Sequence, residues 1–139
     1  MDQLKLQHQI CFPVYTLAKE IVNRYRPFLQ ALDLTYPQYL VLLVLWEKDS
    51  QTVSEIGEKL NLDSGTLTPL LKRLEQKKIL VRLRSERDER AVIISLTDNG
   101  KKLREKARNI PSEMVETLSA SIEDLKILKN NIDKILSNL

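Results

Sequence analysis

Residues 35–46 constrain the fold of this chain more than any other segment of its sequence. Thr35 and Gln38 have the spacing of a capping box, and Pro37 between them suits the first turn of a helix. The following residues, 39–46, are apolar without interruption. A helix that is apolar on all sides belongs at the centre of a domain, so the other elements must pack around it.

Length and composition indicate one compact domain. The chain has 139 residues, of which 42% are hydrophobic and 29% charged, which argues against disorder and against a long multidomain enzyme. No apolar run reaches the roughly 18 residues that would cross a bilayer, and the N-terminal residues lack the pattern of a signal peptide. We therefore expect a soluble cytoplasmic protein with no membrane partner.

The residue types that support metal or nucleotide chemistry are scarce. One cysteine, Cys11, excludes an intrachain disulfide, and one histidine, His8, leaves too few ligands for a zinc site. With 3 glycines, the chain has neither a dinucleotide-binding glycine pattern nor a phosphate-binding loop. We expect no metal, no cofactor and no catalytic residue, and the composition favours a binding protein.

Positive charge is concentrated in residues 66–92, although the net charge of the whole chain is only +3. A local basic stripe is typical of a nucleic-acid-binding surface, but charge runs are also common on ordinary solvated surfaces. Within this segment the acidic residues are Glu75, Glu86, Asp88 and Glu89. The basic residues are Lys72, Arg73, Lys77, Lys78, Arg82, Arg84, Arg87 and Arg90.

Two short helices joined by a tight break are predicted in the middle of the chain. Thr52 and Glu55 repeat the capping pattern before the first helix, and residues 61–63 form the break. Leucines recur on one side of the second helix, whose first turns we expect Pro69 to distort. This is a helix-turn-helix, whose second helix presents polar groups to the DNA major groove. Those polar residues are Ser64, Thr66, Thr68, Lys72 and Arg73.

A β-hairpin follows these helices, because the hydrophobic period changes there to two. Residues 80–84 and 91–96 alternate as strands, and the polar residues 85–90 form the tip between them. Residues 101–117 then read as a helix that is interrupted or bent near Pro111.

Long amphipathic helices are predicted at both ends of the chain. One covers residues 6–32, with Pro13 near its first turn or bending it, and the last runs from about Ser121. Pairing their apolar stripes with a second copy would bury them with two-fold symmetry, while an antiparallel pair within a monomer stays an alternative. We expect residues 1–34 and 101–139 to form a dimerisation region, and residues 35–100 to bind DNA.

Several segments together resemble a known family. They are Gln9-Ile10-Cys11-Phe12, residues 34–41, residues 62–75, Asp88-Glu89-Arg90 and residues 96–100. In order and content the chain resembles the MarR family of winged helix-turn-helix transcription regulators, in particular its organic-hydroperoxide-sensing OhrR/SarZ/MgrA-like branch. The resemblance covers nearly the whole chain and weakens after Gly100. It implies a mainly α fold with a small β-wing (α+β), in which the terminal helices form a dimerisation domain.

The resemblance implies a homodimer that binds a pseudo-palindromic operator in double-stranded DNA. Such a repressor holds DNA while Cys11 is reduced and leaves it when Cys11 is oxidised. Chemically, a thiolate attacks a peroxide oxygen and becomes a sulfenic acid, which condenses with another thiol or is oxidised further. The chain has no second cysteine, so we expect a mixed disulfide with a small cellular thiol, or overoxidation. For a lone cysteine, a small buried core residue is the ordinary alternative.

Tyrosine hydroxyls bind the reactive sulfur in this family, which implies Tyr25 and Tyr36 here, with Tyr15 as a third candidate. Tyr15 lies one helical turn after Cys11 and on the same face. Tyr25 lies 14 residues after Cys11, which is about 21 Å along a continuous helix. A contact between Cys11 and Tyr25 must therefore come from another subunit, which places the sensor at the dimer interface.

Recognition of DNA is expected from the second helix of the helix-turn-helix and from the hairpin. Ser64, Thr66, Thr68 and Arg73 would face the major groove. The hairpin tip would reach the minor groove with Arg90, whose guanidinium the resemblance pairs with Asp88. The remaining basic side chains would contact phosphates or stay solvated, namely Lys72, Lys77, Lys78, Arg82, Arg84 and Arg87.

Two other functions stay open on the sequence alone. A cysteine-dependent thiol peroxidase would need a group that activates the thiol of Cys11, for which His8 and Lys19 are the nearest candidates. A helical dimeric adaptor without DNA binding would leave the basic hairpin unexplained. A DNA affinity that falls steeply with salt would distinguish a DNA-binding protein from both.

Overall fold

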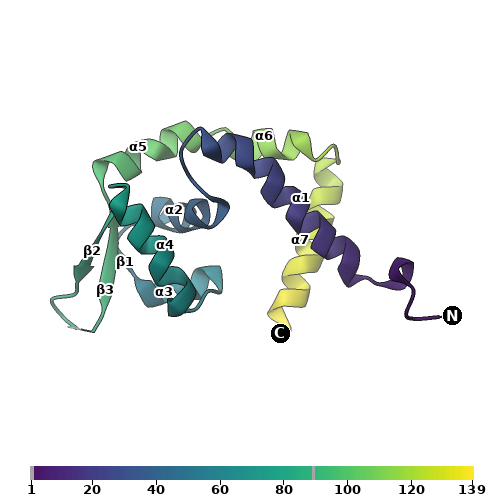
Figure 1. Cartoon of the computed structure of the whole chain (residues 1–139), viewed down its shortest axis with the longest axis horizontal. Coiled ribbons are helices and arrows are strands. Elements are labelled where there is room, and N and C mark those ends of the chain that lie inside the picture. Colours follow the sequence, from purple (N-terminus) through teal and green to yellow (C-terminus); the bar gives the residue numbers. More distant parts are fainter. Residues whose placement is uncertain (1, 89) are drawn as a thin grey trace. The chain divides into compact units, whose positions relative to one another are not determined.

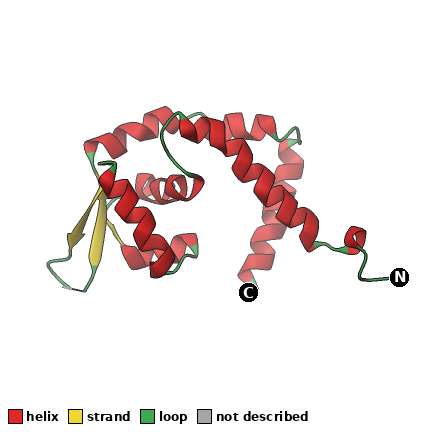
Figure 2. Ribbon diagram, viewed as in Figure 1, coloured by secondary structure: helices red, strands yellow, loops and turns green. Residues whose placement is uncertain are grey.

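The structure is a computed structural model that describes residues 2–88 and 90–139. These residues fall into two compact units, one of residues 25–108 and one of the N-terminal residues up to Arg24 with residues 109–139. Helices predominate, and the small antiparallel sheet belongs to the first of these units (Figure 2). The expected mainly α fold with a small β-wing is confirmed.

Helix α2 (Tyr36–Glu47) forms the centre of the unit of residues 25–108, as its apolar sequence predicts. The predicted capping box is present: the Thr35 hydroxyl accepts from the Gln38 N–H at 3.3 Å, and the Gln38 side-chain oxygen accepts from the Thr35 N–H at 3.1 Å. Val41 and Leu42 are fully buried. Around α2 pack α3 (Val53–Leu60), α4 (Ser64–Gln76) and α5 (Asp98–Ala107).

Helices α3 and α4 form the predicted helix-turn-helix. Asn61 ends α3 in the left-handed conformation, with φ of 54°, and the Leu62 N–H donates to the Gly57 carbonyl at 2.9 Å. The turn passes so close that a Cβ at position 57 would lie 2.8 Å from the Leu62 carbonyl oxygen. The close turn therefore requires glycine there. Leu67, Leu71 and Leu74 of α4 are buried, and the helix continues through Pro69 to its end.

Three strands form one antiparallel sheet within the described residues, in the order β1-β3-β2 (Figure 1). β2 (Leu80–Arg84) and β3 (Val92–Leu96) make the predicted hairpin. The sequence predicts that the second strand begins at Ala91, but β3 begins at Val92, because the Ala91 N–H donates to the Asp88 carbonyl within the tip at 3.0 Å. β1 (Gln51–Thr52) is not predicted, since two residues are too few to show a period.

The first long helix begins at Cys11 and not at Leu6. A separate 3-10 turn, η1 (Leu6–His8), precedes α1 (Cys11–Gln30). The prediction is wrong here because the ring of Pro13 would crowd the Gln9 carbonyl in a continued helix. Instead, Pro13 occupies the first turn of α1, where helix N–H groups lack intrahelical partners in any case.

The C-terminal helices are interrupted where the sequence predicts an interruption. α5 starts at Asp98, three residues earlier than expected, because the Thr97 hydroxyl caps it by accepting from the Gly100 N–H at 3.1 Å. α6 (Ile110–Thr117) has Pro111 in its first turn. α7 (Ile122–Ser137) begins near Ser121, as predicted, and the Ser121 hydroxyl caps it by accepting from the Asp124 N–H at 3.0 Å.

The unit that contains the terminal helices has few buried side chains. Arg24 joins α1 to α6 by donating to the Thr117 carbonyl at 2.9 Å, and Ile110 and Met114 of α6 are buried. In α7 no described residue is buried, and Ile122, Ile127 and Ile135 are about 60% exposed. The apolar face of α7 is therefore open in a single chain.

Candidate redox site and DNA-binding surface

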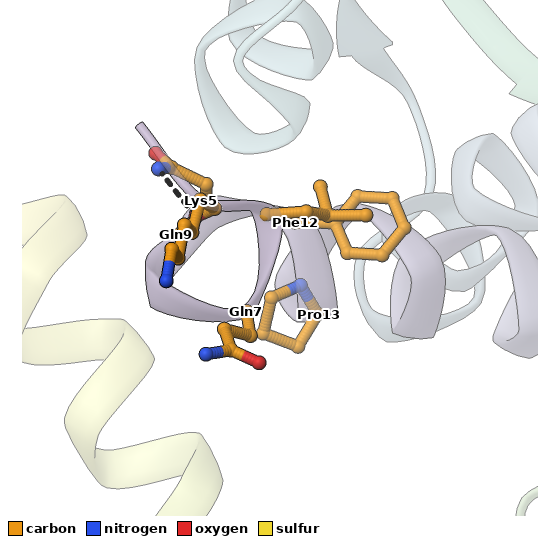
Figure 3. A pocket seen from close by; sticks show the side chains of 6 residues that line it. Lys5, Gln7, Gln9, Phe12 and Pro13 are labelled. Carbon is orange, nitrogen blue, oxygen red and sulfur yellow. Dashed lines mark hydrogen bonds between the residues drawn. The ribbon is translucent and has the colours of Figure 1, made fainter. Parts of the chain in front are cut away.

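Cys11 is the first residue of α1, and it is exposed. The two residues that follow it, Phe12 and Pro13, line an open pocket of about 700 Å³ (Figure 3). Gln9 also lines this pocket, and its side-chain nitrogen donates to the Lys5 carbonyl at 3.0 Å (Figure 3). An accessible thiol can react with a solute, whereas a buried structural thiol is inert. Cys11 is thus not part of the core of a single chain.

Tyr25 and Tyr36, the two tyrosines implied by the resemblance, lie against each other. Their ring centroids are 4.8 Å apart, and the ring of Tyr39 lies 5.7 Å from Tyr25 and 6.3 Å from Tyr36. Burial, reinforced by the two neighbouring tyrosines, raises the pKa of Tyr25 to about 12. Burial also raises the pKa of Tyr36 and of Tyr39. All three hydroxyls therefore stay protonated near neutral pH and can donate a hydrogen bond.

Tyr15 has a different environment from these three tyrosines. It is 60% exposed, and the Lys19 ammonium lies 4.6 Å from the centre of its ring, within the range of a cation–π contact. Helix α1 runs unbroken from Cys11 to Gln30, so Cys11 and Tyr25 of one chain are separated by about four turns of helix. A sulfur–tyrosine contact with Tyr25 requires a second chain and stays a prediction.

The start of α4 is fixed by Asp63. Its carboxylate accepts from the Thr66 N–H at 2.7 Å, and this hydrogen bond holds the pKa of the Asp63 carboxyl below its usual value. Ser64, Thr66 and Arg73 are exposed, whereas Thr68 is half-buried. The exposed face of α4 therefore carries three of the four residues predicted to face the groove.

Hydrogen bonds between side-chain oxygens and backbone N–H groups shape the tip of the hairpin. The Ser85 hydroxyl accepts from the Arg87 N–H at 3.2 Å, and the Asp88 carboxylate accepts from the Arg90 N–H at 3.0 Å. Asp88 thus holds the backbone of Arg90, while its predicted contact with the guanidinium stays a prediction. The side chains of Arg84, Arg87 and Arg90 are exposed along β2 and the tip.

Two residues of the basic segment have structural partners. Arg82 pairs with Glu75 at 3.2 Å, which ties β2 to α4. The Lys77 ammonium donates to the Gln38 side-chain oxygen at 3.2 Å and lies 3.7 Å from the Asp33 carboxylate. These contacts assign Lys77 and Arg82 to the support of the helix-turn-helix.

Sequence reasoning assigns Tyr39 and Trp46 to the core and does not connect them with the sensor tyrosines. The structure places Tyr39 in the aromatic cluster and Trp46 edge-on to Tyr39, with ring centroids 6.3 Å apart. The spacings of three and seven between positions 36, 39 and 46 put these rings on one face of a helix. That spacing is the signal that could have predicted the cluster.

Neither a metal site nor a membrane span is found in the described part of the chain. No group of histidine, cysteine, aspartate and glutamate residues in residues 2–88 and 90–139 could hold a metal ion. Across the same residues, no helix is both long and apolar enough to traverse a bilayer.

Comparison with known proteins connects these features. A family model described as transcriptional regulator SarA/Rot matches residues 23–107. The chain is 50% identical to the organic hydroperoxide resistance transcriptional regulator of Bacillus subtilis, over 99% of this chain and 94% of that protein. The chain belongs to the SarA/Rot family of transcriptional regulators. This regulator is also 39% identical to SarZ of Staphylococcus aureus, over 95% of its own length and 89% of SarZ.

A solved structure supports the same assignment. Reduced AbfR of Staphylococcus epidermidis bound to DNA is 37% identical to the regulator, with a TM-score of 0.82 over 99% of this chain and 95% of AbfR. The resemblance to the OhrR/SarZ branch and the winged helix fold are thus confirmed. The relatives are transcriptional regulators and not enzymes, which decides against the thiol peroxidase alternative.

Proposed function

We propose that this regulator represses transcription as a homodimer on a pseudo-palindromic operator while Cys11 is reduced, and that an organic hydroperoxide releases it by oxidising Cys11. One observation carries the proposal: the thiol of Cys11 is exposed in a chain that is 50% identical to an organic hydroperoxide resistance regulator. Because the ligand is chromosomal DNA, the regulator acts in the cytoplasm.

The DNA contacts follow from the exposed faces of α4 and the hairpin. Ser64, Thr66, Thr68 and Arg73 read base edges in the major groove, where hydroxyl and guanidinium groups match the donors and acceptors of the bases. Arg90 enters the minor groove, and Arg84 and Arg87 contact phosphates. The exposure of Ser64, Thr66 and Arg73 on a capped helix supports this assignment.

The homodimer follows from the apolar side chains that a single chain leaves exposed. Ile10, Phe12 and Val14 near the start of α1 are 46% to 80% exposed, and the apolar face of α7 is open as described above. A second copy covers these faces with equivalent ones, because a two-fold interface pairs the same patch on both subunits. The same symmetry suits an operator with two related half-sites.

The redox step converts the Cys11 thiolate into a sulfenic acid. The sulfur attacks the terminal oxygen of the hydroperoxide, an S–O bond forms as the O–O bond breaks, and the alkoxide leaves as an alcohol after protonation. A small cellular thiol then condenses with the sulfenic acid and releases water, which gives a mixed disulfide. The chain itself holds no second cysteine for this role.

Tyrosines of the partner subunit complete the sensor. Tyr25 and Tyr36 lie together with protonated hydroxyls, and each can donate to the Cys11 sulfur of the other chain. Oxidation changes these hydrogen bonds and rotates one DNA-binding unit against the other. Tyr15, one turn after Cys11 in the same chain, is the third contact.

Two measurements test the proposed function. Selection from random duplexes should yield a two-half-site operator whose affinity for the reduced protein falls steeply with salt, since phosphate contacts release counterions. Adding cumene hydroperoxide should then dissociate the complex. Affinity that does not depend on salt, or a complex that survives the hydroperoxide, would contradict the proposal.

Two matched heterodimers test whether the sensor spans the subunits. In the first, one subunit carries Tyr25→Phe and the other Cys11→Ser, so the remaining Cys11 faces an intact Tyr25 across the interface. In the second, one subunit carries both substitutions and the other neither, so the remaining Cys11 faces phenylalanine. The first should respond to hydroperoxide more strongly than the second, and the reverse order would show that the tyrosine acts within one chain.

A further inference from the structure

The aromatic cluster of Tyr25, Tyr36 and Tyr39 continues to Trp46. Tyr39 is 2% exposed and lies between the two other tyrosines and the indole, whose ring plane is at 69° to its own. The four rings thus form a continuous series of aromatic contacts, in which Tyr39 is buried and the other three rings are half-buried. This series of contacts is a physical route from Tyr25 and Tyr36 to Trp46.

Trp46 is bonded to the base of the hairpin. Its indole N–H donates to the Gly100 carbonyl at 2.9 Å, a contact between residues 54 positions apart. Gly100 lies so close to the backbone of Ile79 that a Cβ there would lie 2.2 Å from the Ile79 carbonyl oxygen. Thr97 is hydrogen-bonded to the same backbone segment, because its hydroxyl donates to the Lys78 carbonyl at 2.6 Å and its N–H donates to the Ile79 carbonyl at 3.0 Å.

This bonded group lies where both strands of the hairpin meet the helices. Ile79 directly precedes β2, and Thr97 directly follows β3. The indole of Trp46 is thus one hydrogen bond away from the residues that set the position of the hairpin. Among the described residues, no buried side-chain nitrogen or oxygen lacks a hydrogen-bond partner.

We propose that Trp46 is a positioning residue that couples the aromatic cluster to the base of the hairpin, so that a change at Tyr25 and Tyr36 alters the hairpin through the indole N–H. This inference rests on the proposed function only in taking oxidation of Cys11 as the event that changes Tyr25 and Tyr36. The coupling itself is a property of residues 25–108 and does not require oxidation. It explains how a sensor made of tyrosines can act on a DNA contact that they do not touch.

Amide hydrogen exchange of the reduced protein tests the coupling. Tyr36→Leu removes one ring of the cluster, and it should speed exchange in peptides covering residues 78–84 and 96–100 by about three- to tenfold, the factor expected for losing one hydrogen bond. In the Trp46→Phe background, which keeps a ring but has no N–H donor, Tyr36→Leu should add no further increase. Tyr36→Phe keeps the ring and should restore the slow exchange.

Two controls separate this effect from general loss of structure. Peptides of α4 report the stability of the whole unit, and Tyr15→Leu removes a tyrosine from outside the cluster. Equal acceleration by Tyr36→Leu with and without the indole N–H, or none at all, would overturn the coupling. Because no oxidant is used, a failure of hydroperoxide to release DNA would contradict the proposed function and leave this result standing.

Discussion

Replacing Ile132 and Leu136 of α7 with lysine tests whether the terminal helices pair with those of a second copy. These side chains are 40% and 57% exposed in a single chain. Full burial of a leucine or isoleucine contributes about 1.5 to 3 kcal/mol, so the half that is still exposed contributes about 1 kcal/mol per side chain on association. Four side chains in a symmetric dimer give about 4 kcal/mol, or roughly a thousandfold in Kd.

This value is a lower limit for the double substitution, because an ammonium group buried in an apolar interface adds a desolvation penalty. Sedimentation equilibrium of the parent and of Ile132→Lys/Leu136→Lys over nanomolar to micromolar concentrations measures the shift. The control Asn130→Lys/Ser137→Lys adds the same charge to exposed polar positions of the same helix. We expect the control to dimerise like the parent. A dimer that persists unchanged in the α7 variant, or a parent that is monomeric at micromolar concentration, would refute the reasoning.

Three further substitutions test the hairpin, the turn and the tyrosines. Arg90→Ala should weaken operator binding by about 1 to 3 kcal/mol at matched salt, and unchanged affinity would remove the hairpin tip from the mechanism. Gly57→Ala should lower the free energy of unfolding by about 1 to 3 kcal/mol, because its Cβ would meet the Leu62 carbonyl. Denaturant titration measures this loss, with Gly65→Ala as the control, because a Cβ at position 65 has its nearest neighbouring atom 3.4 Å away. Because folded Tyr25 keeps its proton up to about pH 12, whereas an unfolded tyrosine loses it near pH 10, stability should fall between these values. Tyr25→Phe should show a smaller fall, and an equal fall would contradict the assignment.

The sequence predicts those helices, turns and strands whose sequence patterns lie within a few consecutive residues. The capping box of Thr35 and Gln38, the break at residues 61–63 and the change of period at residues 80–96 each lie within one local segment. Each is present in the structure with small differences at its ends. The start of α1 is the exception, because apolar spacing continues upstream of Pro13 while the proline ring does not permit the helix.

Contacts between distant residues are not predictable in this way. The pairing of β1 with β3, the Lys77 bond to Gln38 and the Trp46 bond to Gly100 each join residues that are tens of positions apart. No local period or spacing encodes such a contact, since it depends on how the helices pack. The structural roles of Lys77 and Arg82 in the basic segment are therefore evident only from the structure. The same holds for the hydrogen bond between Trp46 and Gly100 at the base of the hairpin.

Part of the candidate site could be predicted from the sequence, and part of it is known only from the structure. The resemblance implies Cys11, Tyr25 and Tyr36, and helix geometry requires any contact between Cys11 and Tyr25 to join two subunits. The structure adds that Tyr25 and Tyr36 are in contact, that Cys11 is exposed and that Tyr39 belongs to the cluster. The orientation of the Asp88 carboxylate toward the Arg90 backbone is likewise a result of the structure alone.

The most direct test of the redox switch compares the parent protein with Cys11→Ser on the same operator duplex. Fluorescence anisotropy of a labelled duplex would be recorded for both proteins before and after stoichiometric cumene hydroperoxide, followed by a reducing thiol. Before oxidation both proteins should bind with similar affinity, because a serine hydroxyl can meet the same tyrosines. The parent should then leave the DNA and return on reduction, while Cys11→Ser should stay bound throughout. Release of Cys11→Ser by hydroperoxide to the same extent as the parent would contradict the assignment of Cys11 as the sensor.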